Sequence, residues 1–236
     1  MDLDLVFLGT SGSLPTARRA PAATLLRRGG ERLLFDCAEG TQRQLLRSTV
    51  GLPELDEIFL THYHADHYGG LPYMLKTFAL RGRETPLTVY GPSGLRDLFG
   101  QLKRIFGGLS YEVALVELGA GECLERAGYR LETFATDHGV PALGYALREH
   151  ARPGRFDVET ADRLGVPAQL RGLLQRGEPV GVAGRTVRPE EVLGPARAGR
   201  KVVLTGDTAA SPRVVEAAHG ADVLVHEATF CAAELE

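Results

Sequence analysis

The sequence predicts an α/β protein in which short apolar strands end in polar side chains and helices follow them. Residues 58–60 are an apolar run typical of a buried strand. Gly69-Gly70 and Pro72 then break the strand and begin a helix. Residues 95–106 carry leucine and phenylalanine at helical spacing, which predicts an amphipathic helix.

The remaining elements alternate in the same way along the chain. The hairpin pairs residues 22–27 with 31–36 about Gly29-Gly30. Further strands are expected at residues 3–8, 87–90, 113–116, 129–136, 143–147, 201–205 and 221–226. Further helices are expected at residues 40–48, 71–80 and 211–218.

Composition is that of one globular domain spanning residues 1–236. The chain is 44% hydrophobic and 24% charged, with a net charge of -3, which argues against a protein that coats nucleic acid over its whole surface. No apolar run is long enough to cross a membrane, and the first residues lack a signal-peptide pattern. Cys37, Cys123 and Cys231 are far apart and odd in number. They predict reduced thiols in a cytoplasmic protein.

A histidine-rich loop directly after the strand at residues 58–60 is the main functional signal. It places His62, His64, Asp66 and His67 within six residues. Alternate side chains of an extended segment point the same way, so His62 and His64 can face one point. Asp66 and His67 can face a second point as the chain bends. Imidazole and carboxylate ligands suit zinc, with manganese or iron as alternatives.

Two later strands also end in residues that could bind a metal. His138 follows the strand at residues 129–136, and Asp207 follows the strand at residues 201–205. The alternative role for Asp207 is to cap the helix expected at residues 211–218.

Residues 150–200 interrupt the rhythm of strands and helices. They are rich in glycine, proline and arginine, and they predict little regular structure beyond a short helix at residues 158–164. Between His150 and Lys201 there are ten Lys/Arg and six Asp/Glu. A locally basic segment is what phosphate binding requires, although a solvated arginine-rich surface would give the same count.

Several motifs together resemble those of the ribonuclease Z family, the tRNA 3′-processing endonucleases of the metallo-β-lactamase fold. The HxHxDH pattern at residues 62–67 resembles the signature of the metallo-β-lactamase superfamily as a whole. The motifs that narrow it are Phe7-Leu8-Gly9-Thr10-Ser11-Gly12, Leu34-Phe35-Asp36-Cys37-Ala38-Glu39-Gly40, Leu204-Thr205-Gly206-Asp207-Thr208 and His226-Glu227-Ala228-Thr229-Phe230. The resemblance implies an αβ/βα four-layer sandwich of two mixed sheets flanked by helices, here C-terminally truncated so that the last strand and helix are missing. It also implies that residues 150–200 are an inserted tRNA-binding arm, without the family's Gly-Pro element, and that the protein is a homodimer.

The resemblance further implies a site with two zinc ions, or manganese in their place. His62, His64 and His138 would hold one ion, and Asp66, His67 and Asp207 would hold the second, with Asp207 bridging. Metal hydroxide would attack the phosphodiester of precursor tRNA, remove the 3′ trailer and leave a tRNA 3′-OH, with Asp66 as general base. The family's last metal-binding histidine has no counterpart here, so we expect the second ion to bind weakly.

Two other functions remain open at the level of the sequence. The first is a small-molecule phosphodiesterase or lactonase of the same fold. The second is a truncated, non-catalytic RNA-binding relative. The basic segment favours RNA over a small substrate, and the six intact candidate ligands favour an enzyme over a binding protein.

Overall fold

The computed structural model describes residues 2–52 and 55–230. It divides the chain into two compact units. One unit comprises Leu131–Ala146 with the described parts of residues 1–124 and 202–236. The other unit comprises Glu125–Arg130 and Leu147–Lys201. All six candidate metal ligands belong to the first unit.

A six-stranded sheet forms the centre of the first unit, in the order β1-β2-β3-β4-β5-β6. Its strands are β1 (Leu3–Gly9), β2 (Ala23–Arg28), β3 (Glu31–Phe35), β4 (Glu57–Phe59), β5 (Leu87–Gly91) and β6 (Val113–Glu117). The hairpin about Gly29-Gly30 is confirmed, because Arg28 pairs with Glu31 in an antiparallel register. Strands β3 to β6 are parallel, so their carboxyl ends lie at the same edge of the sheet.

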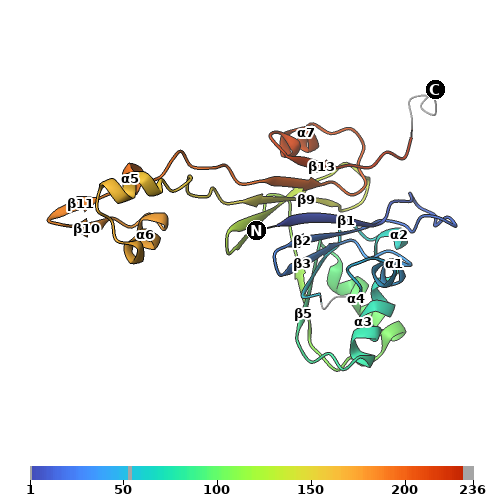
Figure 1. The fold of residues 1–236 in the computed structure, drawn as a ribbon. Coiled ribbons are helices and arrows are strands. Elements are labelled where there is room, and N and C mark those ends of the chain that lie inside the picture. Colours follow the sequence, from blue (N-terminus) through green and yellow to red (C-terminus); the bar gives the residue numbers. More distant parts are fainter. Residues whose placement is uncertain (1, 53–54, 231–236) are drawn as a thin grey trace. The chain divides into compact units, whose positions relative to one another are not determined.

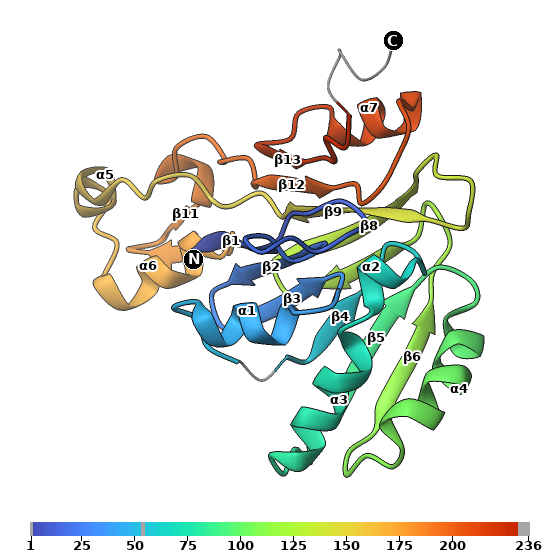
Figure 2. The ribbon, with the colours of Figure 1, turned by 90° about the vertical axis from the view of Figure 1, so that its right-hand side faces the viewer.

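Helices α1 (Thr41–Arg47), α3 (Leu71–Leu80) and α4 (Leu95–Phe106) lie on one side of this sheet (Figure 2). Their apolar residues pack with those of the strands into one buried cluster, which includes Ile58, Met74 and Leu102. Burial of this apolar surface is the main stabilising contribution to the unit.

Aromatic side chains fill the other face of the sheet. The rings of Phe35 and Phe59 stack with centroids 5.1 Å apart, and those of Phe59 and Tyr90 stack at 4.6 Å. Tyr145 packs edge-on against Phe59 and donates a hydrogen bond of 2.7 Å to the Leu60 carbonyl. Since Tyr145 belongs to β9 (Leu143–Glu149), this contact joins the two sheets through an apolar core.

The second sheet has the order β13-β12-β9-β8-β7. Its other strands are β7 (Cys123–Arg126), β8 (Tyr129–Ala135), β12 (Lys201–Leu204) and β13 (Val223–Val225). Helix α7 (Pro212–Ala218) lies on the side of β12 and β13 that faces away from the first sheet (Figure 1). The expected arrangement of two sheets flanked by helices is therefore confirmed.

The expectation that residues 150–200 hold little regular structure is wrong. They form α5 (Val158–Arg163), α6 (Ala168–Gln175), β10 (Val180–Val182), β11 (Arg185–Val187) and the 3₁₀ helix η1 (Pro189–Glu191). Ala161, Leu174 and Val187 belong to a separate buried cluster. The turn between β10 and β11 uses Ala183 and Gly184, both at positive φ, which lacks the usual Asn-Gly signature of a hairpin.

A bidentate ion pair closes the base of this segment. Nε and Nη2 of Arg200 donate to the two carboxylate oxygens of Glu149, at 2.7 and 2.8 Å. The Glu149 side chain is only 3% exposed. Hydrogen bonds from Arg200 lower the pKa of Glu149 from 4.5 to about 2. Because the folded pKa is depressed, the stabilisation is present above pH 4.5 and is lost as the pH falls toward 2.

Glu149→Gln is therefore expected to lower the free energy of unfolding at pH 7 by about 3 kcal/mol, since each unit of pKa difference is worth about 1.4 kcal/mol. Urea unfolding of wild type and variant between pH 7 and pH 3 measures this. The difference between the two proteins should shrink below pH 4.5, and the exposed-site control Glu159→Gln should show no such trend. A difference that stays constant with pH would contradict the assignment.

No helix within the described parts of the chain is long and apolar enough to span a membrane.

Candidate metal centre

The candidate ligands lie at the ends of strands from both sheets. His62, His64, Asp66 and His67 follow β4, His138 follows β8 and Asp207 follows β12. Residues 65–68 form the short helix α2 (Ala65–Tyr68), which the sequence does not predict. This turn of helix redirects Asp66 and His67 away from the extended segment that carries His62 and His64.

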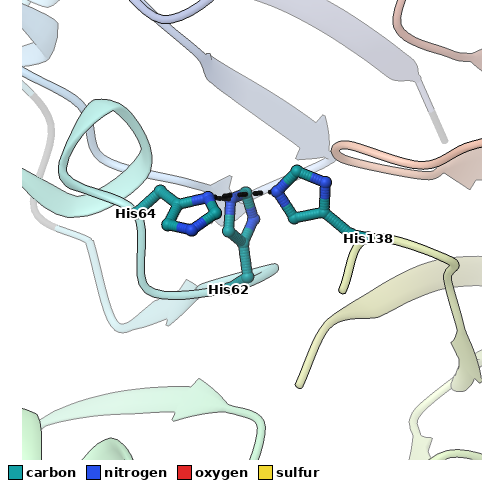
Figure 3. Close-up of side chains that lie close together, drawn as sticks. All are labelled: His62, His64 and His138. Carbon is teal, nitrogen blue, oxygen red and sulfur yellow. Dashed lines mark hydrogen bonds between the residues drawn. The ribbon is translucent and has the colours of Figure 1, made fainter. Parts of the chain in front are cut away.

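Three imidazoles converge in a first group (Figure 3). Nε2 of His62 lies 3.1 Å from Nδ1 of His64, and Nε2 of His138 lies 3.0 Å from the same atom. His62 is fully buried, whereas His64 is exposed. Three nitrogen atoms facing one point, with an open side toward solvent, form an arrangement suited to a catalytic metal ion.

A second group joins His62 and His67 with Asp207. Oδ1 of Asp207 lies 3.3 Å from Nε2 of His67, and its Oδ2 lies 3.8 Å from Nε2 of His138. Asp207 therefore faces ligands of both groups. It does not cap α7, whose N-cap residue is Ser211.

Asp66 stands slightly apart from these groups. Its Oδ2 is 3.7 Å from Nε2 of His67, but it belongs to neither convergent group among the described residues. The structure thus brings five of the six candidate ligands together and places Asp66 beside them. It also places His62 in both groups, whereas the sequence suggests only the first.

The protonation of the histidines shows how the donor set could accept a cation. Burial, followed by the charge of His67, lowers the pKa of His62 to about 3, so the ring is neutral and one of its nitrogens offers a lone pair. Burial also lowers the pKa of His67, but the carboxylates of Asp36 and Asp207 outweigh it and raise that pKa to about 10. In the absence of a metal, the His67 imidazolium supplies the positive charge that faces Asp207. A divalent cation could replace this charge, with release of the proton.

Asp36 holds His67 in position next to the candidate metal centre. The sequence alone assigns Asp36 no role there. Its carboxylate accepts hydrogen bonds from the Thr61 backbone N–H (2.8 Å) and hydroxyl, and lies 2.8 Å from Nδ1 of His67. These contacts turn Nε2 of His67 toward Asp207, as outer partners of metal-binding histidines commonly do. The sequence offers one signal for this role of Asp36, an acidic residue directly after the apolar strand β3. That strand pairs in parallel with β4, which precedes the histidine loop.

A second set of hydrogen bonds connects the loop that contains His138 with the loop that contains Asp207. The Asp137 N–H donates to the Thr208 hydroxyl (3.1 Å), and the Ala209 N–H donates to the Asp137 carbonyl (2.6 Å). The Thr208 N–H donates to Oε1 of Glu227 at 2.5 Å. These hydrogen bonds hold two ligands that are far apart in the sequence in a fixed relation to each other.

A cavity of about 350 Å³ opens beside the second group. Asp36, His67 and Asp207 border it on one side, and Phe7 and the glycine loop after β1 border it on the other. We refer to it as the Phe7 cavity. A substrate held there would lie directly against the candidate ligands.

Known proteins share both the sequence and the fold of this chain. The family model described as the metallo-beta-lactamase superfamily matches residues 17–164. Ribonuclease Z of Methanosarcina acetivorans is 47% identical over 231 residues, which are 97% of this chain and 75% of that protein. Ribonuclease Z of Myxococcus xanthus is 45% identical over an alignment of 237 positions, which covers 99% of this chain and 77% of that protein.

Solved structures agree with this assignment. Human tRNase Z, short form, superposes with a TM-score of 0.68 and 26% identity over 97% of this chain and 79% of that one. The metallo-beta-lactamase fold protein YhfI from Bacillus subtilis, at 19% identity, has a TM-score of 0.60 over 93% of this chain and 68% of that one, and supports the fold alone. With the family-model match and the relatives above 40% identity, these findings confirm that the chain belongs to the ribonuclease Z family of the metallo-β-lactamase superfamily.

Proposed function

We propose that this protein is a metal-dependent endoribonuclease that removes the 3′ trailer from precursor tRNA. The observation that carries the proposal is the pair of convergent ligand groups that share His62 and are both faced by Asp207. The relatives named ribonuclease Z supply the substrate class.

The residues divide into two sets of metal ligands. His62, His64 and His138 would hold one ion, and His67 and Asp207, with Asp66 beside them, would hold a second. Neutral imidazoles and carboxylates suit zinc, with manganese as the alternative. Bound divalent ions supply Lewis acidity and lower the pKa of water to about 7.

The chain's own side chains would then handle the proton and the orientation of the site. Asp66 would accept a proton from the attacking water at its carboxylate, as a general base. Asp36 keeps Nε2 of His67 directed at Asp207. The Thr208 hydroxyl, which accepts a hydrogen bond from the Asp137 N–H, keeps Asp207 and His138 in a fixed relative position. The expected products are a tRNA with a 3′-OH and a trailer with a 5′-phosphate.

Cleavage of a precursor tRNA with a 3′ trailer tests this function. The assay uses zinc or manganese, with His64→Ala as the inactive variant and His219→Ala, an exposed histidine at the end of α7 and outside both groups, as the matched control. Cleavage at the acceptor-stem boundary, abolished only in His64→Ala, is the expected result. A folded, metal-loaded chain that leaves the precursor intact would refute the proposal.

The segment from residue 150 to 200 supports an RNA substrate. Arg171, Arg176, Arg185 and Arg200 are engaged in ion pairs. Arg152, Arg155, Arg188 and Arg197 are exposed and form no ion pair with any described residue. Arg152 and Arg197 lie opposite each other in an antiparallel bridge, where like charges repel unless an anion lies between them. We propose that these four arginines bind RNA phosphates.

Changing these four arginines to glutamine should weaken binding of precursor tRNA and lower its dependence on salt. Removing one arginine–phosphate interaction should reduce the slope of log affinity against log salt by about one. Hydrolysis of bis(p-nitrophenyl) phosphate should stay unchanged, because that substrate has no RNA chain for the arm to bind. The control replaces four exposed cations elsewhere: Arg47, Arg81, Lys103 and Arg104. An equal fall in activity on both substrates, or unchanged RNA binding, would contradict the role of the arm.

A cytoplasmic homodimer belongs to the same proposal. Cys37 is a buried thiol in no disulfide with any described residue, and burial raises its pKa well above the usual range, which fits a reducing compartment. The dimer rests on the family resemblance. Light scattering of the purified chain tests it, and a mass of one chain at assay concentration would contradict it.

A further inference from the structure

The Thr61 side chain is buried among the groups that hold the candidate metal ligands. Thr61 lies just after β4 and directly before His62, and it is 2% exposed. Its hydroxyl oxygen lies 2.9 Å from Oδ2 of Asp36, 3.0 Å from Nδ1 of His62 and 3.4 Å from Nδ1 of His67. One hydroxyl therefore contacts both histidines of the second ligand group, one of which also belongs to the first.

The hydroxyl of Thr61 has a single proton, and the geometry decides where that proton lies. A carboxylate only accepts hydrogen bonds, and both carboxylate oxygens of Asp36 lie within 3.1 Å of the Thr61 oxygen. The hydroxyl proton must point toward Asp36, because two acceptor oxygens repel each other when no proton lies between them. The Thr61 oxygen is then left to accept a hydrogen bond from Nδ1–H of the neutral His62 ring.

This chain of hydrogen bonds determines which nitrogen of His62 is free. With the proton on Nδ1, the lone pair is on Nε2. Nε2 is also the atom that lies 3.1 Å from Nδ1 of His64 in the first group. Asp36 orients His67 directly, because its Oδ2 lies 2.8 Å from Nδ1 of that ring. A single buried carboxylate thus orients His67 by direct contact and His62 through the Thr61 hydroxyl.

The rest of the Thr61 side chain packs against the residue before Asp207. A Cβ atom placed on Gly206 would lie 2.7 Å from Cβ of Thr61 and 2.8 Å from both its Cγ2 and its Oγ1, which leaves no room for a side chain at residue 206. The Thr61 N–H donates to Oδ1 of Asp36, and the Thr61 carbonyl accepts from the Leu143 N–H, at 2.8 and 2.9 Å. These contacts fix the backbone and the rotamer of Thr61, so the hydroxyl is held between Asp36 and the histidines.

We propose that Thr61 is a positioning residue whose hydroxyl sets the tautomer of His62 and connects both ligand groups to Asp36. The inference rests on the metal site of the proposed function and names a residue that acts on that site without binding the ion. Valine matches the shape of threonine, so Thr61→Val keeps the packing on Gly206 and removes only the hydroxyl. Thr61→Ser keeps the hydroxyl and is the conservative variant.

NMR of the metal-free protein labelled with ¹⁵N-histidine tests the tautomer. A long-range ¹H–¹⁵N correlation spectrum shows which ring nitrogen carries the proton, and a spectrum of His62→Gln assigns the signals of His62. We expect Nδ1–H in wild type and in Thr61→Ser. In Thr61→Val the Nδ1–H has no acceptor, so the proton should move to Nε2 and be donated to Nδ1 of His64.

Wild type with His62 protonated at Nε2, or Thr61→Val with the tautomer of wild type, would overturn the inference. The wild-type spectrum and that of Thr61→Ser decide the question even if Thr61→Val does not fold.

Zinc affinity, measured by chelator competition, tests the consequence for the metal. Thr61→Val should bind zinc about 10- to 100-fold more weakly than wild type, the usual cost of losing an outer partner of a metal-binding histidine. Thr61→Ser should restore the affinity. The matched control is Thr133→Val, because Thr133 is also buried and its hydroxyl donates to the Gly119 carbonyl at 2.6 Å, outside both ligand groups. It should bind zinc as wild type does.

Unchanged zinc affinity in Thr61→Val, or a loss that Thr61→Ser shares in full, would also overturn the inference. Thermal unfolding of each variant shows that the measured chain is folded. Neither the spectra nor the zinc titrations use RNA, so a failure of this inference is distinguishable from a failure of the proposed tRNA cleavage.

Discussion

Replacing Asp207 with alanine is expected to lower the rate of phosphodiester cleavage by at least about a thousandfold, because removing several kcal/mol of transition-state stabilisation has that effect. Asp207 is the carboxylate that faces ligands of both groups, at 3.3 Å from His67 and 3.8 Å from His138. No other carboxylate among the described residues belongs to either convergent group. Its removal leaves the neutral imidazoles, with the Asp66 carboxylate beside them, to hold two divalent ions.

Metal content and cleavage rate should change together in this variant. Zinc per chain, measured by mass spectrometry after dialysis, should fall relative to wild type, and added zinc should not restore the rate. Asp97→Ala, which removes an exposed carboxylate on α4, is the matched control and should behave as wild type. Retention of both the metal and a rate within about tenfold of wild type would exclude Asp207 as a ligand.

Asp36→Asn should weaken metal binding by about 10- to 100-fold, the usual cost of removing an outer partner of a metal-binding histidine. Asn keeps the size of the side chain and tolerates the positive φ of 56° at this position. It lacks the charge that, with Asp207, raises the pKa of His67. Its amide can still face Thr61, so the fold should be retained while the orientation of His67 is weakened.

Chelator competition measures the affinity, and activity at limiting and saturating zinc separates this effect from a defect in chemistry. Activity should recover substantially at saturating zinc in Asp36→Asn but not in Asp207→Ala. Asp4→Asn, which alters an exposed ion pair with Arg27, is the control. An unchanged zinc affinity would show that Asp36 serves packing alone.

The histidine loop can be predicted because its information is local. His62 and His64 are two residues apart in extended backbone and must point the same way, and Gly69-Gly70 and Pro72 mark the helix that follows. The hairpin about Gly29-Gly30 is local in the same sense. The structure of residues 150–200 cannot be predicted in this way, because its elements are short and its turn signals are weak. Its buried cluster forms only after the chain has folded back on itself.

The sequence by itself determined the family, the order of most elements outside residues 150–200 and the candidate ligands, since each of these depends on residue type and short spacing. Only the tertiary structure decided which ligands meet, that His62 faces both groups, and that Asp36 and Thr208 hold them in place. Asp36 bonds to His67 across 31 residues, and Asp137 bonds to Thr208 across 71. No periodic pattern encodes such contacts, because they depend on how two separate sheets bring their strand ends to one edge.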